Sequence, residues 1–492
     1  MTAGLNSRPM EGGTETARQA VFDRMANRLR VQSRTIQSGR KPLLEPYQAQ
    51  FRPNSGRLLQ PTLLAASDGF NKPVALASIA DRVRPTVENA STAKDALPII
   101  TASLPVEKPN TSVQGRQPNY GLRGQGGPLA RLQAKLQALK SGQRTQPVTI
   151  LHIGDSHVAS DSFSQGIRRK LQAEYGNAGR GAVIPAGAFK YGFIDQAKMT
   201  RSGNWRSHTA LRQRKGRYGI SGVSVSSRSS RASMKMTVRN GEFDWASVTV
   251  ATGPSQGSVV LKVGDTTKRF DAHASKKGSK TFQIKAKGSV FEVRPGGGAQ
   301  TTVLNWATGR NTPGIRYINF GLIGATVNIT KRFNPQLVAN DIRAIKPDLI
   351  VYGFGTNEGF NDNLNLARYA SYAKGWMGSL LDAAPQADVV YMGAASGLRR
   401  RNGQRCGSWA IPKKMKPLRQ TVKEVAAAQN GAYWDWSKAM GGDCAVNSWA
   451  GKGLAARDRV HLTSKGYRRS AAYFVDWLTA PERSNRVVAL NQ

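Results

Sequence analysis

The chain has 492 residues, of which 39% are hydrophobic, so it is long enough for a sizeable core and for more than one domain. Its 72 Lys and Arg residues outnumber its 30 Asp and Glu residues, and the formal charge of +42 predicts attraction to a polyanion. Nucleic acid, an anionic cell wall or envelope polymer, and acidic lipid head groups would all satisfy this charge. Nucleic acid is disfavoured, because the sequence lacks zinc-knuckle spacing, an aromatic RNA-binding signature and a helix-turn-helix.

The sequence contains few signs of its compartment. No stretch reaches the roughly 18 to 20 apolar residues that a membrane span needs, and the N-terminus lacks the charged-then-apolar pattern of a secretory signal. Cys406 and Cys444 are the only cysteines and are too few to form a metal site by themselves. They form either a disulfide or two unpaired buried thiols, and a disulfide would indicate an oxidising compartment such as a periplasm.

Residues 1–125 are predicted to be a mostly disordered basic region. They are rich in Arg, Gln, Ser, Pro and Thr and show no sustained apolar period. A short basic amphipathic stretch at 21–31 is expected to be a solvated transient helix, with contact to a membrane surface or a partner as the alternative. Leucines recur at helical spacing over 129–139, so organised structure is expected to begin near Gly127.

Residues 126–195 and 313–482 are predicted to form one discontinuous α/β domain. Short apolar runs typical of buried parallel strands alternate there with helical segments. This pattern predicts a flavodoxin-like, doubly wound sheet of five parallel strands. The strands are expected at 148–154, 317–323, 348–352, 389–392 and 432–434. The clearest helices are expected at 163–175, 366–383, 418–429 and 463–478.

The segment 196–312 lies between the first and second of these strands and has a different texture. Apolar and polar residues alternate in short runs, which Gly, Asp and Asn turns separate. The length of the segment and the number of runs predict an inserted all-β sandwich or jelly roll. The expected strands are 223–227, 234–238, 246–251, 258–263, 280–284, 289–293 and 301–306.

A candidate nucleophile follows the first expected strand. The segment 152–157 reads His-Ile-Gly-Asp-Ser-His and lies where the strand meets its helix, the position at which doubly wound sheets bind ligands. The hydroxyl of Ser156 is then expected at the carboxyl edge of the sheet, with its amide N–H directed at a developing oxyanion. The alternative is that Ser156 only caps the helix. Asp155 is expected to hydrogen-bond to loop backbone.

A candidate base precedes the last expected helix. Asp458 and His461 lie three residues apart, so one turn of chain can present both side chains. Acyl transfer needs an imidazole that accepts the serine proton and a carboxylate that fixes the tautomer of that imidazole. A loop salt bridge or a cap is the alternative for an isolated pair at this spacing. Asp435 is a rival carboxylate at the same edge, and Asp458 is preferred because its spacing to His461 constrains it.

Two further loops are expected to open on the same edge of the sheet. Gly324 follows the second strand, and Asn357 follows the third strand within a Gly-Thr-Asn segment. The amide of Asn357 and the backbone N–H groups of Gly324 and Ser156 would together stabilise an oxyanion. A tight turn at Gly324 and a helix cap at Asn357 are the alternatives.

No metal and no other cofactor is expected. The remaining histidines have no ligand spacing with one another, and His157 next to the candidate nucleophile either shapes the pocket or makes a strand-end hydrogen bond. These four histidines are His152, His157, His208 and His273.

The order of these pieces resembles the SGNH, or GDSL-like, hydrolases. The four blocks are Gly-Asp-Ser, an isolated Gly, Gly-x-Asn and a terminal Asp-x-x-His, and the resemblance covers about 145–480 with the insert included. It implies that Ser156 is the nucleophile, that His461 is the base and that Asp458 orients it. It also implies that Gly324 and Asn357 are oxyanion donors beside the N–H of Ser156.

Within that family the chain is most similar to the bacterial peptidoglycan O-acetylesterases. The shared features are Gly-Asp-Ser-His at 154–157, Gly-Thr-Asn-Glu at 355–358 and a β-rich module after the first block, here 196–312, which resembles carbohydrate-binding jelly rolls. The chain departs from the family in having Ile-Gly-Ala at 323–325 instead of Asn-Gly-Ala. Its long basic N-terminal region also has no counterpart in the family.

The resemblance implies a serine esterase that removes O-acetyl groups from a carbohydrate polymer, with peptidoglycan favoured. It also implies a periplasmic or cell-envelope location, and the cytoplasm is the alternative because no secretory signal is visible. An O-acetyltransferase acting on a cell-surface glycan would use the same acyl-enzyme and differ only in its acceptor. A polyanion-binding protein with a vestigial hydrolase site is a third possibility. A lipase or thioesterase is disfavoured by the Gly- and Arg-rich segment 397–405.

Overall fold

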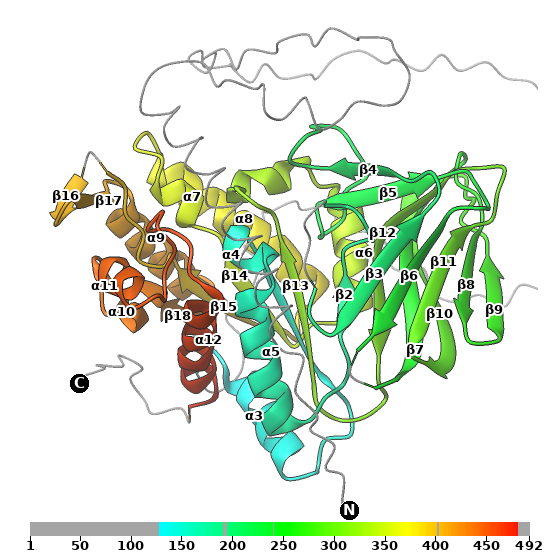
Figure 1. Cartoon of the computed structure of the whole chain (residues 1–492), viewed down its shortest axis with the longest axis horizontal. Helices are drawn as coiled ribbons and strands as arrows, with labels where there is room; N and C mark the ends of the chain where they lie inside the picture. Colours follow the sequence, from blue (N-terminus) through cyan, green and yellow to red (C-terminus); the bar gives the residue numbers. More distant parts are fainter. Residues whose placement is uncertain (1–126, 190–193, 240, 401–402, 481–492) are drawn as a thin grey trace, which may run out of the picture. The chain divides into compact units, whose positions relative to one another are not determined.

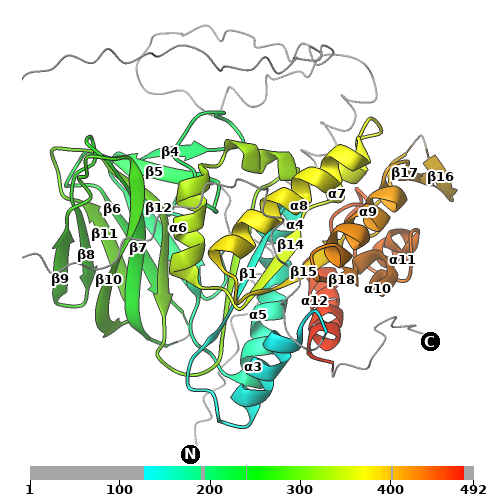
Figure 2. The same cartoon turned by 180° about the vertical axis from the view of Figure 1, so that it is seen from behind.

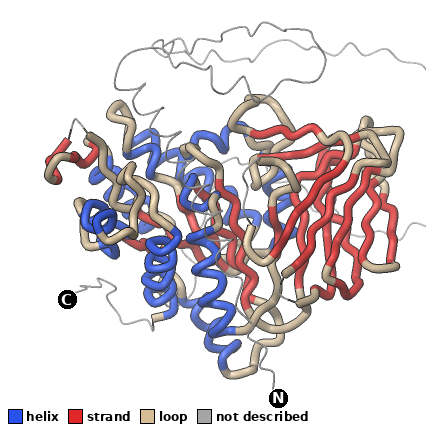
Figure 3. Tube along the Cα trace, viewed as in Figure 1, coloured by secondary structure: helices blue, strands red, loops and turns tan. Residues whose placement is uncertain are grey.

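A computed structural model of the chain describes residues 127–189, 194–239, 241–400 and 403–480. The predicted disordered region at 1–125, with its basic stretch at 21–31, lies outside the described residues. Within the described ranges, no helix combines the length and the apolar character that crossing a membrane requires. Figure 3 shows that strands and helices alternate in one part of the molecule and that strands predominate in the other.

A five-stranded parallel sheet forms the centre of the α/β part, as predicted (Figure 1). Its strands stand in the order β13-β1-β14-β15-β18, which is 2-1-3-4-5 in order along the chain and is the flavodoxin-like arrangement. All four neighbouring pairs run parallel. The strands are β1 (Val148–Gly154), β13 (Ile315–Gly321), β14 (Leu349–Gly353), β15 (Asp388–Gly393) and β18 (Ala432–Asp435).

The second strand lies two residues earlier than predicted. It ends at Gly321, and the N–H of Leu322 donates the last hydrogen bond to β1, to the carbonyl of Gly154 at 3.0 Å. The apolar character of Leu322 and Ile323 extended the predicted strand to 323, although these residues belong to the loop that carries Gly324. The position of this loop matters because it opens at the carboxyl edge of the sheet.

Helices cover both faces of the sheet, as a doubly wound fold requires (Figures 1 and 2). Neighbouring strand residues alternate between the two faces, so Ile150 packs in one hydrophobic cluster and Leu151 in the other. On the face of Ile150 lie α3 (Ala130–Lys140), α5 (Ser162–Tyr175) and α12 (Ser464–Thr479). On the face of Leu151 lie α6 (Pro335–Ile345), α8 (Leu366–Ala383) and α9 (Met415–Ala427).

Short elements build the loops at the edge of the sheet. Thr463 caps α12, because its hydroxyl accepts from the N–H of Gly466 at 3.2 Å. The short helices are α4 (Ser156–Ala159), η2 (Val327–Arg332), α7 (Thr356–Gly359), α10 (Trp436–Met440) and α11 (Ala445–Gly451). A hairpin is formed by β16 (Gly403–Cys406) and β17 (Trp409–Pro412).

The segment between β1 and β13 folds mainly into two antiparallel sheets. Aromatic side chains meet between them: the rings of Phe291 and Trp306 lie 5.7 Å apart, and those of Phe270 and Phe282 stack at 4.8 Å. One sheet contains β2 (Gly181–Val183), β4 (Arg206–Thr209), β5 (Val223–Ser227), β7 (Phe243–Thr252), β10 (Gly278–Gly288) and β12 (Thr301–Gly309). The other contains β3 (Ala197–Ser202), β6 (Ser233–Val238), β8 (Val259–Val263), β9 (Thr266–Phe270) and β11 (Val290–Pro295).

Each of the seven strand predictions in this segment falls on an observed strand, but β2, β3, β4 and β9 were not predicted. The strand β9 is almost entirely exposed, so it lacks the apolar alternation by which strands are recognised. The strand β2 precedes residue 196 and pairs with β12. The boundaries 196–312 of an inserted module therefore remain a proposal.

A buried carboxyl group joins this β segment to α6. Asp341 of α6 accepts the N–H of Ile220 and the side-chain amide of Asn305, both at 2.9 Å. Burial raises the pKa of Asp341 to about 7. The same hydrophobic cluster contains residues from the β segment and from one face of the parallel sheet. The two parts thus share a continuous core.

Cys406 and Cys444 form a disulfide, so the first of the two alternatives for the cysteines is correct. Their Cα atoms lie 5.6 Å apart, and the bond closes a separation of 38 residues. It links the hairpin of β16 and β17 to the residue before α11. A covalent link across a loop of this length restricts the unfolded chain and fixes the hairpin against the α/β part.

We expect the double substitution Cys406→Ala/Cys444→Ala to lower the free energy of unfolding by about 2 to 4 kcal/mol, because the unfolded chain regains its loop entropy. Chemical denaturation with and without a reductant measures this effect. The wild-type protein should lose a similar amount of stability on reduction, and the double variant should not respond to the reductant. A wild-type protein insensitive to reduction would contradict a stabilising disulfide.

Candidate active site

The chain places Ser156 directly at the carboxyl end of β1. Ser156 is the first residue of α4, and the carboxylate of Asp155 accepts the N–H of His157 at 3.0 Å, which caps this short helix. Gly154 permits the tight packing before it, because a Cβ there would lie 2.4 Å from the carbonyl oxygen of Gly353. The sharp strand-to-helix turn is thus possible only with glycine at this position.

The structure brings Ser156, His461 and Asp458 together in one hydrogen-bonded chain. The Oγ of Ser156 lies 3.0 Å from Nε2 of His461, and Nδ1 of His461 lies 2.7 Å from Oδ2 of Asp458. The second carboxylate oxygen of Asp458 accepts the backbone N–H groups of Val460 and His461 at 2.9 and 3.0 Å. Ser156 and His461 are 2% and 1% exposed, so the chain of contacts is shielded from solvent.

The surroundings of Asp458 keep its carboxyl group ionised. Burial alone would raise its pKa, but the hydrogen bond and charge of His461 and two backbone N–H groups outweigh burial, so the pKa is lowered from its usual value. An ionised Asp458 holds the proton on Nδ1 of His461. The Nε2 lone pair is then free to accept the proton of the Ser156 hydroxyl, which is the arrangement that acyl transfer requires.

Gly324 and Asn357 lie in the loops that follow the two strands beside β1. Gly324 has a φ of +71°, which favours glycine, and no heavy atom lies within 4 Å of a Cβ built there. The N–H of Gly324 has no hydrogen-bond acceptor in the described part of the chain. The N–H of Ser156, at the start of α4, has no acceptor within that helix. The Asn357 side-chain amide gives one proton to the carbonyl of Ala325 at 2.8 Å, so its second proton stays available. These donors suit an oxyanion.

Two buried histidines near the site are neutral. His157 contacts the hydroxyl of Tyr467 on α12 through Nδ1 at 2.7 Å, so its hydrogen bond joins α4 to α12. His152 makes the equivalent contact with Tyr317 at 2.7 Å. Burial lowers both pKa values to about 3, and the charge of His461 contributes for His157. A neutral His157, whose ring lies 5.4 Å from that of His461, would not repel a protonated His461 imidazole.

The rival carboxylates have other partners. Asp435 caps α10 by accepting the N–H of Lys438 at 2.8 Å. Asp155 caps α4, and burial raises its pKa to about 6. In the described ranges, only Asp458 forms an ion pair with His461. The same ranges contain no group of three or more His, Cys, Asp or Glu side chains that could bind a metal ion.

Glu358 is a buried carboxyl group next to Asn357. The sequence pattern does not reveal its role. Its Oε1 accepts the N–H of Val327 at 2.6 Å, which ties α7 to the residue that begins η2, three residues after Gly324. Its Oε2 is buried with no hydrogen-bond partner among the described residues. Burial raises the pKa of Glu358 to about 8, so the group is protonated near neutral pH.

The raised pKa of Glu358 predicts a pH dependence of stability. The folded protein keeps a proton that the unfolded chain releases near pH 4.5, so the resulting stabilisation is lost as the pH rises toward about 8. As the pH rises from 5 to 8, the free energy of unfolding of the wild type should therefore fall by at least about 1 kcal/mol more than that of Glu358→Gln. Exposed Glu424→Gln is the control and should follow the wild type. Parallel stability curves for wild type and Glu358→Gln would show that Glu358 is ionised in the folded protein.

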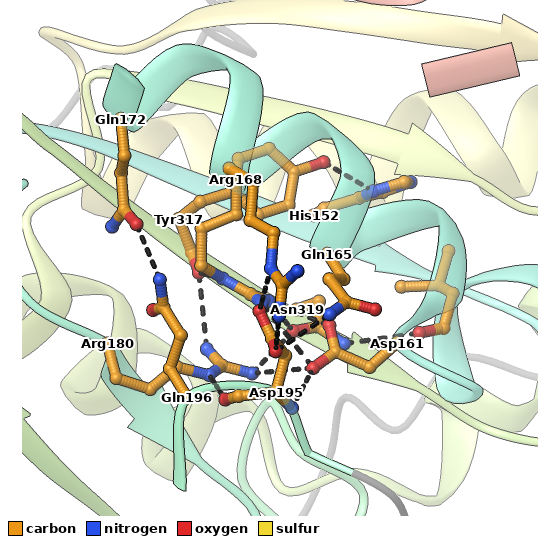
Figure 4. Close-up of polar contacts among 12 residues, drawn as sticks. His152, Asp161, Gln165, Arg168, Gln172, Arg180, Asp195, Gln196, Tyr317 and Asn319 are labelled. Atoms are coloured by element: carbon orange, nitrogen blue, oxygen red, sulfur yellow. Dashed lines mark hydrogen bonds and ion pairs between the residues drawn. The ribbon is translucent and has the colours of Figure 1, made fainter. Parts of the chain in front are cut away.

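A buried ionic network links the start of α5 to the segment that follows β2 (Figure 4). The guanidinium of Arg168 on α5 contacts Asp161 at 2.7 Å and Asp195 at 3.6 Å, and that of Arg180 contacts Asp161 at 3.6 Å. The four side chains are at most 4% exposed. Two positive and two negative groups balance, which offsets the cost of burying each charge.

The network joins three parts of the chain. Asp161 precedes α5, and its Oδ2 accepts the N–H of Asp195 at 2.7 Å, near the start of the β segment. The side-chain oxygen of Asn319 on β13 accepts from Arg168 and Arg180, while its amide donates to the carbonyl of Val158 in α4 at 3.2 Å. The helix that carries Ser156 is thus held by the same side chains that hold the entry to the β segment.

This network was not predicted from the sequence. Its signal is a polar stripe at helical spacing, formed by Asp161, Gln165, Arg168 and Gln172, beside the apolar stripe that predicted α5. A stripe of this kind is ordinarily a solvated face. Its burial depends on Arg180 and Asp195, which the sequence does not place nearby.

We expect Arg168→Met to lower the free energy of unfolding by about 3 to 5 kcal/mol, because it leaves buried Asp161 and Asp195 without their shared cation. Arg169→Met is a matched control. Arg169 contacts the same Asp195 at 2.9 Å, but its side chain is 57% exposed, so the loss should stay below about 1 kcal/mol. Equal losses in the two variants, measured by chemical denaturation, would contradict the importance of the buried network.

The sequence of the chain matches a family model at residues 292–469, described as the GDSL-like lipase/acylhydrolase family. The match includes Gly324, Asn357, Asp458 and His461, and it begins C-terminal to the first block, so Ser156 lies outside it. A comparison with curated protein sequences gives no significant match.

A comparison with solved structures finds similar proteins. A peptidoglycan O-acetylesterase is similar at 27% identity with a TM-score of 0.64, covering 72% of this chain and 96% of the other. An acetyl xylan esterase, AlAXEase, matches at 16% identity and a TM-score of 0.26, over 33% and 79% of the two chains. A family two carbohydrate esterase from Cellvibrio japonicus matches at 12% and 0.24, over 57% and 97%. The last two likenesses are too weak to support an argument.

Proposed function

We propose that this carboxylic ester hydrolase, which matches the GDSL-like lipase/acylhydrolase family at residues 292–469, removes O-acetyl groups from a carbohydrate polymer, foremost peptidoglycan. The observation that carries the proposal is the hydrogen-bonded chain of Ser156, His461 and Asp458 at the end of β1. The similarity to a peptidoglycan O-acetylesterase supports the substrate class.

In the first half of the proposed reaction, the acetyl group moves to the enzyme. Nε2 of His461 accepts the Ser156 proton while Oγ attacks the acetyl carbonyl carbon. The carbonyl oxygen becomes an oxyanion, which the N–H groups of Ser156 and Gly324 and the amide of Asn357 stabilise. The intermediate collapses, the bond to the sugar oxygen breaks, and His461 returns the proton to that oxygen. The products are a sugar hydroxyl and an acetylated Ser156.

The second half regenerates the enzyme. His461 takes a proton from a water molecule, and the hydroxide attacks the acetyl carbonyl of the acyl-enzyme. The same donors stabilise the second oxyanion. Acetate leaves, and the proton on His461 returns to Oγ of Ser156. Asp458 stabilises the imidazolium in both halves without itself accepting the proton.

The charge and the disulfide indicate in which cellular compartment this reaction would take place. A disulfide between Cys406 and Cys444 persists in an oxidising compartment, and peptidoglycan lies outside the cytoplasmic membrane. The formal charge of +42 suits an anionic wall or envelope polymer. We therefore place the protein in the periplasm or cell envelope, with the two-sheet β segment as the part that contacts the glycan.

The test is acetate release from O-acetylated peptidoglycan, beside O-acetylated xylan as a second polymer. Ser156→Ala and His461→Ala should lose at least about a thousandfold of kcat/KM, because each removes a group that acts in the transition state. Asp458→Asn should keep more activity than either, because the imidazole is only misoriented. Thermal unfolding should show that all three variants are folded.

Each outcome of this test has a separate meaning. Activity of Ser156→Ala equal to that of the wild type would contradict the mechanism. Serine-dependent release from xylan alone would keep the mechanism and overturn the substrate. Acetyl transfer to an added sugar acceptor, without free acetate, would identify a transferase instead of an esterase.

A further inference from the structure

Arg459 has an unusual backbone conformation inside the Asp458 to His461 block. Its φ is +59°, in the left-handed region that favours glycine, and a side chain there costs about 1 kcal/mol or more. Its carbonyl accepts the N–H of Leu398 at 2.9 Å, and its N–H donates to the carbonyl of Ala456 at 3.1 Å. An arginine two residues before the catalytic histidine is therefore held in a conformation that is unfavourable for its side chain.

The Arg459 guanidinium is fixed by neutral groups. Its Nε donates to the side-chain oxygen of Asn447 on α11 at 3.0 Å, and its Nη1 lies 3.5 Å from the carbonyl of Ala456. Its central carbon lies 5.4 Å from the ring centroid of Trp409. These contacts orient the group and leave its charge unneutralised. Nη2 has no hydrogen-bond partner in the described ranges.

A second arginine contacts the same tryptophan. The guanidinium of Arg400 lies 4.9 Å from the ring centroid of Trp409, and Arg400 is exposed. Trp409 opens β17, and the disulfide of Cys406 fixes the hairpin to which it belongs. The positions of the two cations are thus set by one rigid hairpin beside the Asp458 to His461 turn.

Neighbouring arginines differ in having carboxylate partners. Arg399 binds both oxygens of Asp362 at 2.8 and 2.9 Å, and Arg419 pairs with Asp443. Neither Arg400 nor Arg459 forms an ion pair within the described ranges. Two cations held about an indole ring without an acidic partner attract an anion, and a guanidinium pairs best with a planar carboxylate.

We propose that Arg459 and Arg400, held by Trp409, form a carboxylate-binding subsite for the polymer that carries the acetyl ester. This inference rests on the proposed function and adds that the substrate is selected by a carboxylate near the scissile ester. Binding there orients the ester toward Ser156, and neutral acetyl esters lack this contribution. Arg459 and Arg400 are specificity residues, since the chemical steps belong to Ser156, His461 and Asp458.

The experiment compares kcat/KM on O-acetylated peptidoglycan with kcat/KM on the same material after its carboxyl groups are converted to methylamides. The wild-type enzyme should prefer the untreated polymer by about 10- to 100-fold, the range of a charge-assisted hydrogen bond. Arg459→Gln and Arg400→Gln should each reduce this preference severalfold or more, chiefly through KM. Arg457→Gln removes an exposed charge next to Asp458 and should keep the wild-type preference.

Three further arms separate the possible failures. Removal of the peptides by an amidase hydrolyses the amide to the lactyl group and exposes a carboxylate on the sugar, so a subsite for a sugar carboxylate predicts a raised kcat/KM on the stripped strands and a subsite for a peptide carboxylate predicts a lowered one. Serine-dependent hydrolysis of 4-nitrophenyl acetate with no carboxylate preference on the polymer would overturn the subsite and leave the esterase standing. If the wild type hydrolyses no ester, the proposed function fails. Binding of the Ser156→Ala protein to treated and untreated polymer then decides the subsite, with equal affinities overturning it.

Discussion

The hydrogen bond of 2.7 Å between Asp458 and His461 is the contact on which the site depends, because it holds the imidazole of the turn before the last helix toward Ser156 at the end of the first strand. It fixes the imidazole so that Nε2 meets Ser156 at 3.0 Å. A parallel sheet in which β1 lies between β13 and β14 brings these distant segments to one edge, and helices on both faces keep that edge rigid. The chemistry therefore follows from the topology together with one turn of chain at 458–461.

Buried polar groups around the triad hold its parts in place. Asn319 contacts both Arg168 and α4, and Glu358 ties α7 to the start of η2. These contacts are costly to bury, and their geometry suits a site that must keep its donors fixed while charge develops. The same groups link the nucleophile to the chain that enters the β segment. The same buried side chains thus hold Ser156 in position and attach the β segment to the α/β part.

The sequence was sufficient for the parallel sheet and for the meeting of Ser156, Asp458 and His461, because strand periodicity and block order are local patterns. It was insufficient for the Arg180 to Asp161 contact and for the burial of Glu358, which depend on packing between distant segments. It placed the second strand two residues late, since Leu322 and Ile323 are apolar although they lie in a loop. It also missed β9, whose exposed residues have no apolar period.

The central claim is that Ser156 carries the acetyl group during turnover. The most direct measurement is mass spectrometry of peptides from enzyme quenched in acid while it hydrolyses an O-acetylated substrate. The account predicts one added acetyl group on the peptide that contains Ser156, absent from the Ser156→Ala protein. Steady acetate release with no acetylation at Ser156, or with acetylation at another residue that turnover requires, would contradict it.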